Sequence, residues 1–181
     1  MKRIIIGIVL FVLLIGNAVS DDEDSGIIYG KNWAFMFSVP DGYIWDNVSL
    51  QQHGIWALFY KADQEIFYGN KHHLYINPIQ KGDGYPETTD ELINWDISYY
   101  KQNDPALKVS FYTEKKITDG HIVKIYSFDQ KLRSYYMYYG YLTENNSSFI
   151  FVLIARSQKE RKEKQQAYFD LIQSFKYLDK E

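Results

Sequence analysis

The chain has 181 residues and a formal net charge of −3, with 46% hydrophobic residues, 18% aromatic residues and no cysteine. This apolar content excludes a disordered chain, and the lack of cysteine excludes a disulfide-stapled scaffold and any thiolate chemistry. The slight acidic excess gives no general electrostatic reason to bind nucleic acid.

The first twenty residues have the pattern of a signal peptide. Lys2 and Arg3 are followed by an apolar run from Ile4 to Ile15, and Ala18-Val19-Ser20 supplies small residues for cleavage. The run is shorter than the roughly 20 residues that a membrane-spanning helix needs. We therefore predict a signal peptide at 1–20, a periplasmic or secreted protein, and no stable membrane anchor after cleavage. A short uncleaved anchor or a buried strand is the alternative.

The segment 21–27 opens with four consecutive carboxylates, Asp21 to Asp24. Like charges in sequence repel one another and bury nothing, which predicts a flexible acidic tail. Weak calcium capture is the alternative. The remainder, 28–181, is predicted to be a single domain, because it contains neither a linker nor a repeat.

Short strands dominate the first half of the domain. Trp33 to Val39 alternates between large apolar and small side chains, and a Pro-Asp-Gly turn follows it. Two more strands are predicted, at Ile55–Tyr60 and at His72–Ile76, the second ended by Asn77-Pro78. Residues Gln80–Pro86 contain two glycines and a proline and are predicted to form a loop.

A helix is predicted from Thr88 to Gln102. Thr88 and Glu91 have the spacing of a capping box, in which each side chain binds the other residue's backbone. An apolar stripe follows the helical period. Its members are Ile93, Ile97 and Tyr100, widened by Leu92, Trp95 and Tyr99.

Four strands and a closing helix are predicted after this helix. The strands are Leu107–Phe111, Ile122–Phe128, Ser134–Leu142 and Phe149–Ala155, and Ser157 caps the helix. Phe149 to Ala155 is apolar at every position, so this strand needs cover on both faces of its sheet. The fold class is therefore α+β, with a mainly antiparallel sheet and helices on both faces, an α/β/α sandwich.

Two segments resemble the PsbP-like family of exported proteins. The stretch from Trp33 to Trp45 resembles the family's first strand, Phe-x-Phe-x-x-Pro-x-Gly-Trp, with Tyr43 where tryptophan is common. The run Phe149–Ala155 and the later Ile172–Lys176 resemble the family's last strand and closing helix. The resemblance implies an α/β/α sandwich and a non-catalytic accessory or binding role in the periplasm or the thylakoid lumen. Because such a fold serves unrelated partners, no functional residue is transferred.

The sequence predicts neither a metal site nor a cofactor. The four histidines, His53, His72, His73 and His121, lack metal-ligand spacing, and the adjacent pair points to opposite faces of a strand. No nucleophile motif is present, although a Ser/His/Asp triad can be assembled from distant residues, so a hydrolase stays as a third hypothesis. Asn47, Asn145 and Asn146 begin tripeptides with the N-glycosylation pattern, which matter only on a eukaryotic secretory route.

Aromatic residues are the most unusual feature, with 17 tyrosines. Five of them lie on one predicted strand, at Tyr135, Tyr136, Tyr138, Tyr139 and Tyr141. Both faces of this strand can pack under helices. The functional alternative is an exposed aromatic surface, which together with the loop Gln80–Pro86 would bind a protein of the cell envelope. A small-molecule or glycan binder with an aromatic-lined cleft is the second hypothesis.

Overall fold

The computed structural model describes residues 25–31, 33–48, 55–61, 73–82, 84–130, 134–144 and 147–178. The predicted signal peptide lies outside these ranges, as do His53, His72, Asn145 and Asn146. Within these ranges, neither helix is long and apolar enough to cross a membrane.

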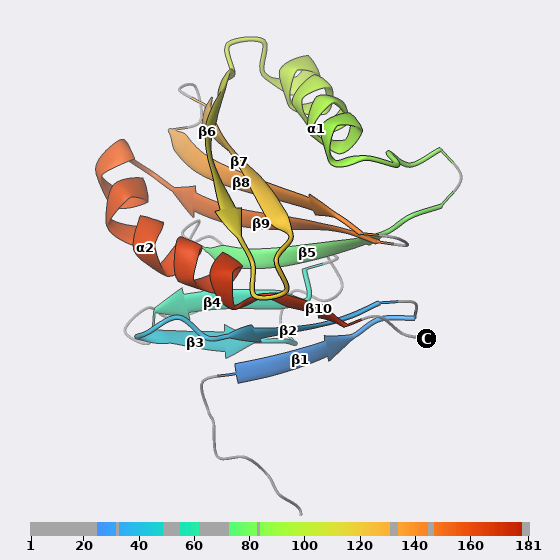
Figure 1. Ribbon diagram of the computed structural model, residues 1–181. Helices are drawn as coiled ribbons and strands as arrows, with labels where there is room; N and C mark the ends of the chain where they lie inside the picture. Colours follow the sequence, from blue (N-terminus) through green and yellow to red (C-terminus); the bar gives the residue numbers. More distant parts are fainter. Residues whose placement is uncertain are drawn as a thin grey trace, which may run out of the picture.

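A seven-stranded antiparallel sheet forms the centre of the molecule (Figure 1). Its strand order is β3-β4-β5-β9-β8-β7-β6, so β9, which contains the apolar run Phe149–Ala155, is the central strand. The strands are β3 (Tyr43–Asp46), β4 (Ala57–Lys61), β5 (Leu74–Gln80), β6 (Lys108–Lys116), β7 (Ile122–Gln130), β8 (Tyr135–Thr143) and β9 (Ser147–Ala155).

A second, three-stranded sheet joins the two ends of the described chain. It consists of β1 (Ser25–Tyr29), β2 (Ala34–Ser38) and β10 (Lys176–Leu178), in the order β1-β2-β10. The prediction of one sheet was wrong here, and β1, β3 and β10 were missed because each is short and lies at a sheet edge. Strand β1 also overlaps the predicted tail 21–27: Ser25, Gly26 and Ile27 pair with β2, so the ordered domain begins before residue 28.

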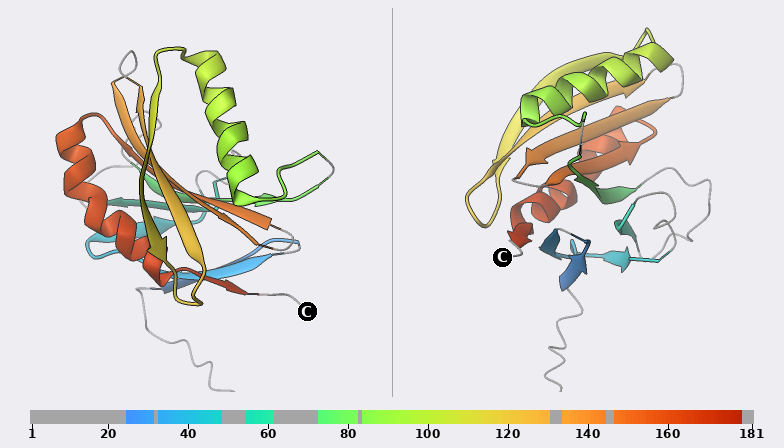
Figure 2. Two further views of the ribbon diagram at one scale, coloured as in Figure 1. Left: turned by 45° about the horizontal axis from the view of Figure 1, so that its top comes forward. Right: turned by 90° about the vertical axis from the view of Figure 1, so that its right-hand side faces the viewer.

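Two helices, α1 (Thr89–Asn103) and α2 (Gln158–Ser174), pack against different side chains of β9. Phe149 and Phe151 belong to the core that contains α2, whereas Ile150 and Val152 belong to the core that contains α1. Successive side chains of a strand point to opposite faces, so the helices cover opposite faces of the β8–β9 region (Figure 2). The α+β class and the largely antiparallel pairing are confirmed.

The face that carries α2 is also covered by the three-stranded sheet. The Phe35 ring of β2 lies 5.5 Å from the ring of Phe149 and 5.2 Å from that of Phe175, which follows α2. Phe37 makes a similar contact with Phe59 of β4, with centroids 5.1 Å apart. The layer on this face is therefore part helix and part sheet.

Strand β5 continues through Asn77-Pro78, where the sequence predicted its end. Pro78 pairs with Phe149 of β9, but β4 pairs with β5 only as far as Ile76. Beyond Ile76, no strand of the described chain pairs with the other side of β5, which is therefore an edge there. A proline, which has no N–H, is tolerated on such an edge.

The first prediction concerns the core. Phe35→Ala removes a fully buried ring, and we expect it to lower the free energy of unfolding by about 3–5 kcal/mol. Phe111→Ala is the matched control, because that ring is 54% exposed. Its expected effect is within about 0.5 kcal/mol. Urea unfolding of both variants measures the difference, and wild-type stability of the Phe35 variant would contradict the assignment.

Candidate functional site

A cleft of about 240 Å³ lies between α1 and the seven-stranded sheet. Helix α1, the loop before it and strands β5, β8 and β9 each contribute to its wall. The lining residues are Tyr75, Asn77, Ile79, Tyr85, Trp95, Asp96, Tyr100, Tyr139, Ile150 and Val152. Half of these residues are aromatic, and among the described lining residues only Asp96 carries a charge.

The start of α1 is fixed by the predicted capping box, which is confirmed. The Thr88 hydroxyl accepts from the Glu91 N–H at 3.2 Å, and the Glu91 carboxylate accepts from the N–H groups of Thr88 (3.1 Å) and Glu87 (2.9 Å). These backbone hydrogen bonds lower the pKa of Glu91. Leu92 and Ile93, both buried, anchor the first turns on the sheet, which places the next turn over the cleft.

Three exposed aromatic side chains form a strip along the mouth of the cleft. Tyr85, Trp95 and Tyr99, here called the aromatic strip, are 46%, 50% and 57% exposed. The Trp95 ring centroid lies 6.4 Å from that of Tyr85 and 6.4 Å from that of Tyr99. The prediction that Trp95 and Tyr99 widen the buried stripe of the helix was wrong. The inner face of α1 is filled by Leu92, Ile93 and Asp96 instead.

Asp96 is a buried carboxylate on the inner face of α1. It is 7% exposed, and its Oδ2 accepts a hydrogen bond from the Tyr141 hydroxyl at 2.8 Å. Burial raises the pKa of Asp96 from 3.8 to about 6, and the Tyr141 hydrogen bond opposes part of that rise. The cleft lining, as far as the chain is described, contains no Lys, Arg or His. A desolvated carboxylate without a cation marks a candidate functional site.

Tyrosine hydroxyls surround this carboxylate. The hydroxyls of Tyr100 and Tyr139 are 2.6 Å apart and share a hydrogen bond. Burial raises the pKa of Tyr75, Tyr100 and Tyr139, so their hydroxyls stay neutral at physiological pH. The cleft thus offers a carboxylate, the Asn77 amide and neutral hydroxyls between apolar walls.

The five predicted tyrosines of β8 do not form an exposed surface. Tyr138 and Tyr139 are each 4% exposed and Tyr141 is fully buried, so the surface hypothesis was wrong for these three. Tyr135 and Tyr136 are half-buried. A strand flanked on both sides and covered by a helix on each face has no side chain facing water along its middle. Tyr139 nevertheless lines the cleft, and Tyr141 holds Asp96.

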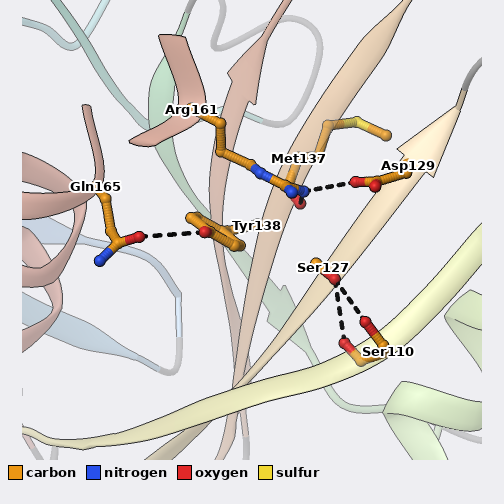
Figure 3. Close-up of polar contacts among 7 residues, drawn as sticks. All are labelled: Ser110, Ser127, Asp129, Met137, Tyr138, Arg161 and Gln165. Carbon is orange, nitrogen blue, oxygen red and sulfur yellow. Dashed lines mark hydrogen bonds and ion pairs between the residues drawn. The ribbon is translucent and has the colours of Figure 1, made fainter. Parts of the chain in front are cut away.

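On the opposite face, an ion pair attaches α2 to the sheet (Figure 3). The Arg161 guanidinium lies 2.6 Å from the Asp129 carboxylate, and it donates to the Met137 carbonyl at 3.3 Å. It also lies over the Tyr138 ring, 4.7 Å from the centroid, while the Tyr138 hydroxyl donates to Gln165 at 3.2 Å. These contacts join α2 to β7 and β8 through largely buried side chains, so we assign the cluster a structural role.

The described histidines do not assemble into a metal site. The Nδ1 atom of His121 lies 2.5 Å from Glu144, and the carbonyl of His73 accepts from the Ile154 N–H. Nowhere in the described ranges do three His, Asp or Glu side chains come together as metal ligands do.

Sequence reasoning missed the carboxylate of the cleft. Asp96 lies within the apolar stripe of its helix, between Ile93, Ile97 and Tyr100, and an acidic residue at such a position was the available signal. Trp95 was predicted to belong to the apolar stripe of the helix, and Tyr85 was predicted only as part of the loop Gln80–Pro86. Their convergence depends on how α1 meets the sheet, which the sequence pattern does not encode.

Comparison with known proteins supports the fold alone. No protein-family model and no curated protein matches the sequence. The solution structure of cyanobacterial PsbP (CyanoP) from Synechocystis sp. PCC 6803 is similar, with a TM-score of 0.52 and 10% sequence identity over 86% of this chain and 94% of that one. The chain therefore has a PsbP-like fold, as the resemblance implied.

The second prediction concerns Arg161. Arg161→Ala leaves the Asp129 carboxylate without its partner in a largely buried position, and we expect a loss of about 3 kcal/mol in the free energy of unfolding. The double change Arg161→Met with Asp129→Leu should recover most of that loss, because no unpaired charge remains. Lys159→Ala is the control, since its ion pair with Glu163 is exposed. An Arg161 variant as stable as this control would contradict the structural role.

The third prediction concerns Asp96. Its raised pKa means that folding favours the protonated acid, so this contribution to stability is present below about pH 4 and is lost as the pH rises through about 6. Asp96→Asn keeps an acceptor for Tyr141 but cannot ionise. The stability of the variant relative to wild type should therefore increase between about pH 4 and 7, by up to about 3 kcal/mol. Urea unfolding across this range measures it, and a difference independent of pH would refute the burial of an ionising Asp96.

Proposed function

We propose that this chain is an exported, non-enzymatic accessory protein that binds a protein of the cell envelope through the α1 side of the sheet. The binding surface consists of the aromatic strip and the adjoining cleft. Export is supported by the pattern of residues 1–20, and the accessory role by the PsbP-like fold.

The observation that carries the proposal is the exposure of the aromatic strip. Trp95 and Tyr99 are about half exposed, although both are large aromatic side chains of the kind that proteins usually bury. Tryptophan and tyrosine supply large contact area at low entropic cost and are over-represented among the residues that dominate protein interfaces. The strip lies beside a concave site, which gives a partner both an anchor and a pocket.

A small molecule or a glycan is the second candidate ligand, because the cleft combines aromatic walls with the Asp96 carboxylate and the Asn77 amide. The volume of the cleft favours a protein partner over a small molecule or a glycan. At about 240 Å³ the cleft is smaller than typical sites for small molecules, which measure roughly 300–1,000 Å³. It has room for a side chain of a larger ligand.

The fourth prediction tests this surface. The tagged full chain is cross-linked in cells, and the protein recovered from the envelope fraction is examined for bound partners and for loss of residues 1–20. Trp95→Ala with Tyr99→Ala should reduce partner recovery at least about tenfold, as expected for interface anchors.

Phe111→Ala with Ile122→Ala is the matched control, because both side chains are about half exposed but lie on β6 and β7. It should leave recovery unchanged. Equal recovery with both double variants would contradict the proposed surface. Binding of a soluble glycan by wild type, without any protein partner, would favour the second candidate.

A further inference from the structure

Among the described residues, none forms an ion pair with the Asp96 carboxylate. Its Oδ2 accepts from Tyr141, and no described residue donates to its Oδ1. Lys124, which reaches α1 from β7, pairs with the exposed Asp90 at 2.7 Å instead. A buried carboxylate is normally paired with a cation or neutralised by several donors. We therefore expect the positive charge that balances the Asp96 carboxylate to come from a bound ligand or partner.

The walls of the cleft suit an organic cation. Trp95, Tyr85 and Tyr100 bring aromatic rings from the helix and its preceding loop, and Tyr75 and Tyr139 bring them from the sheet. Aromatic faces attract ammonium and guanidinium groups, most strongly where water is excluded. An anion would instead be repelled by the Asp96 charge, and no basic residue stands among the described residues of the lining to offset that repulsion.

We propose that the cleft receives one cationic side chain, lysine or arginine, of the protein partner, with Asp96 as its counter-ion and the aromatic residues as its walls. This inference rests on the proposed function and names the chemistry that the partner presents. The cleft volume of about 240 Å³ is small for a whole ligand and leaves room for a single side chain.

The charges of the site fit this occupant at neutral pH. Titratable groups facing Asp96 are Tyr75 from β5, Tyr139 and Tyr141 from β8, and Tyr100 from α1 itself, and burial raises the pKa of each. Between pH 5 and 8 they stay neutral and Asp96 alone changes charge. A bound cation would relieve the cost of ionising this carboxylate in a desolvated position.

The fifth prediction uses three blocked amino acids as probes: N-acetyl-lysine amide, N-acetyl-arginine amide and N-acetyl-norleucine amide. Norleucine has the carbon chain of lysine without the terminal ammonium group. Each is titrated at pH 7.5 into ¹⁵N-labelled protein, and the amide resonances of the cleft residues are followed. At least one cationic probe should bind about tenfold or more tightly than norleucine, and the comparison of lysine with arginine identifies which side chain fits.

Two variants with the same change in charge complete the test. Asp96→Asn should weaken the cationic probe at least about tenfold, whereas Asp90→Asn, on the same helix but outside the cleft, should leave it unchanged. Because Asp96→Asn is expected to be more stable than wild type at this pH, lost binding cannot be attributed to unfolding.

Several outcomes would overturn the inference. If norleucine binds as tightly as lysine and arginine, the cleft recognises only apolar chains. If Asp96→Asn and Asp90→Asn weaken the cationic probe equally, the effect is one of long-range charge and not of the cleft. Failure of all three probes to shift a cleft resonance would refute the pocket for a cationic side chain. In each case the proposed function stands if partner recovery still depends on Trp95 and Tyr99, so the two failures are distinguishable.

Discussion

Strand β9 is the element on which the rest of the structure depends. It lies at the centre of the larger sheet, and its side chains are apolar on both faces. Burial of apolar surface is the main favourable term in folding, so neither face can be left in water. Helix α1 covers Ile150 and Val152, while α2 and the three-stranded sheet share the face of Phe149 and Phe151. The demand for cover on both faces thus explains every layer of the molecule.

One buried carboxylate, Asp96, lies in the contact between α1 and the sheet. Most of the contact is apolar, but the helix presents Asp96 to the sheet, and Tyr141 of β8 satisfies one carboxylate oxygen. The helix therefore packs closely at Leu92 and Ile93 and leaves a cleft one turn later. Keeping an ionisable group there lowers stability at neutral pH, and proteins retain such groups where function requires them.

Patterns within single elements were enough to predict most of the fold. The capping box at Thr88 and Glu91, the alternation in β2 and the apolar run of β9 each specify a local structure through one strong physical preference. The short strands β1, β3 and β10 were not predicted, because a strand of three to five residues has too few positions to show an alternating pattern and is stabilised by its partner strand. The end of β5 was placed too early at Pro78, because this proline is tolerated only where β4 has not yet begun beside it, at Ala57 opposite Ile76.

The site was less predictable than the fold, for a related reason. The choice of Tyr138, Tyr139 and Tyr141 as surface residues followed from their abundance, but burial depends on the layers above and below β8. Trp95 and Asp96 are neighbours in sequence, yet one reaches solvent and the other reaches the sheet. That difference follows from the rotation of α1 about its axis, which is set by packing against several strands of the larger sheet.

Pairing of β10 with β2 gives the chain a particular order of assembly. Met36 lies opposite Lys176, and the rings of Phe35 and Phe175 stack. The N-terminal sheet therefore contains a strand from the C-terminal end of the described chain. Contacts between segments this far apart must close a long loop before they form. Phe37 can pack on Phe59 of β4 early, but Phe35 gains its contacts with Phe149 and Phe175 only after the C-terminal part of the chain has been synthesised. A chain truncated after α2 would lack β10, the closing strand of its N-terminal sheet.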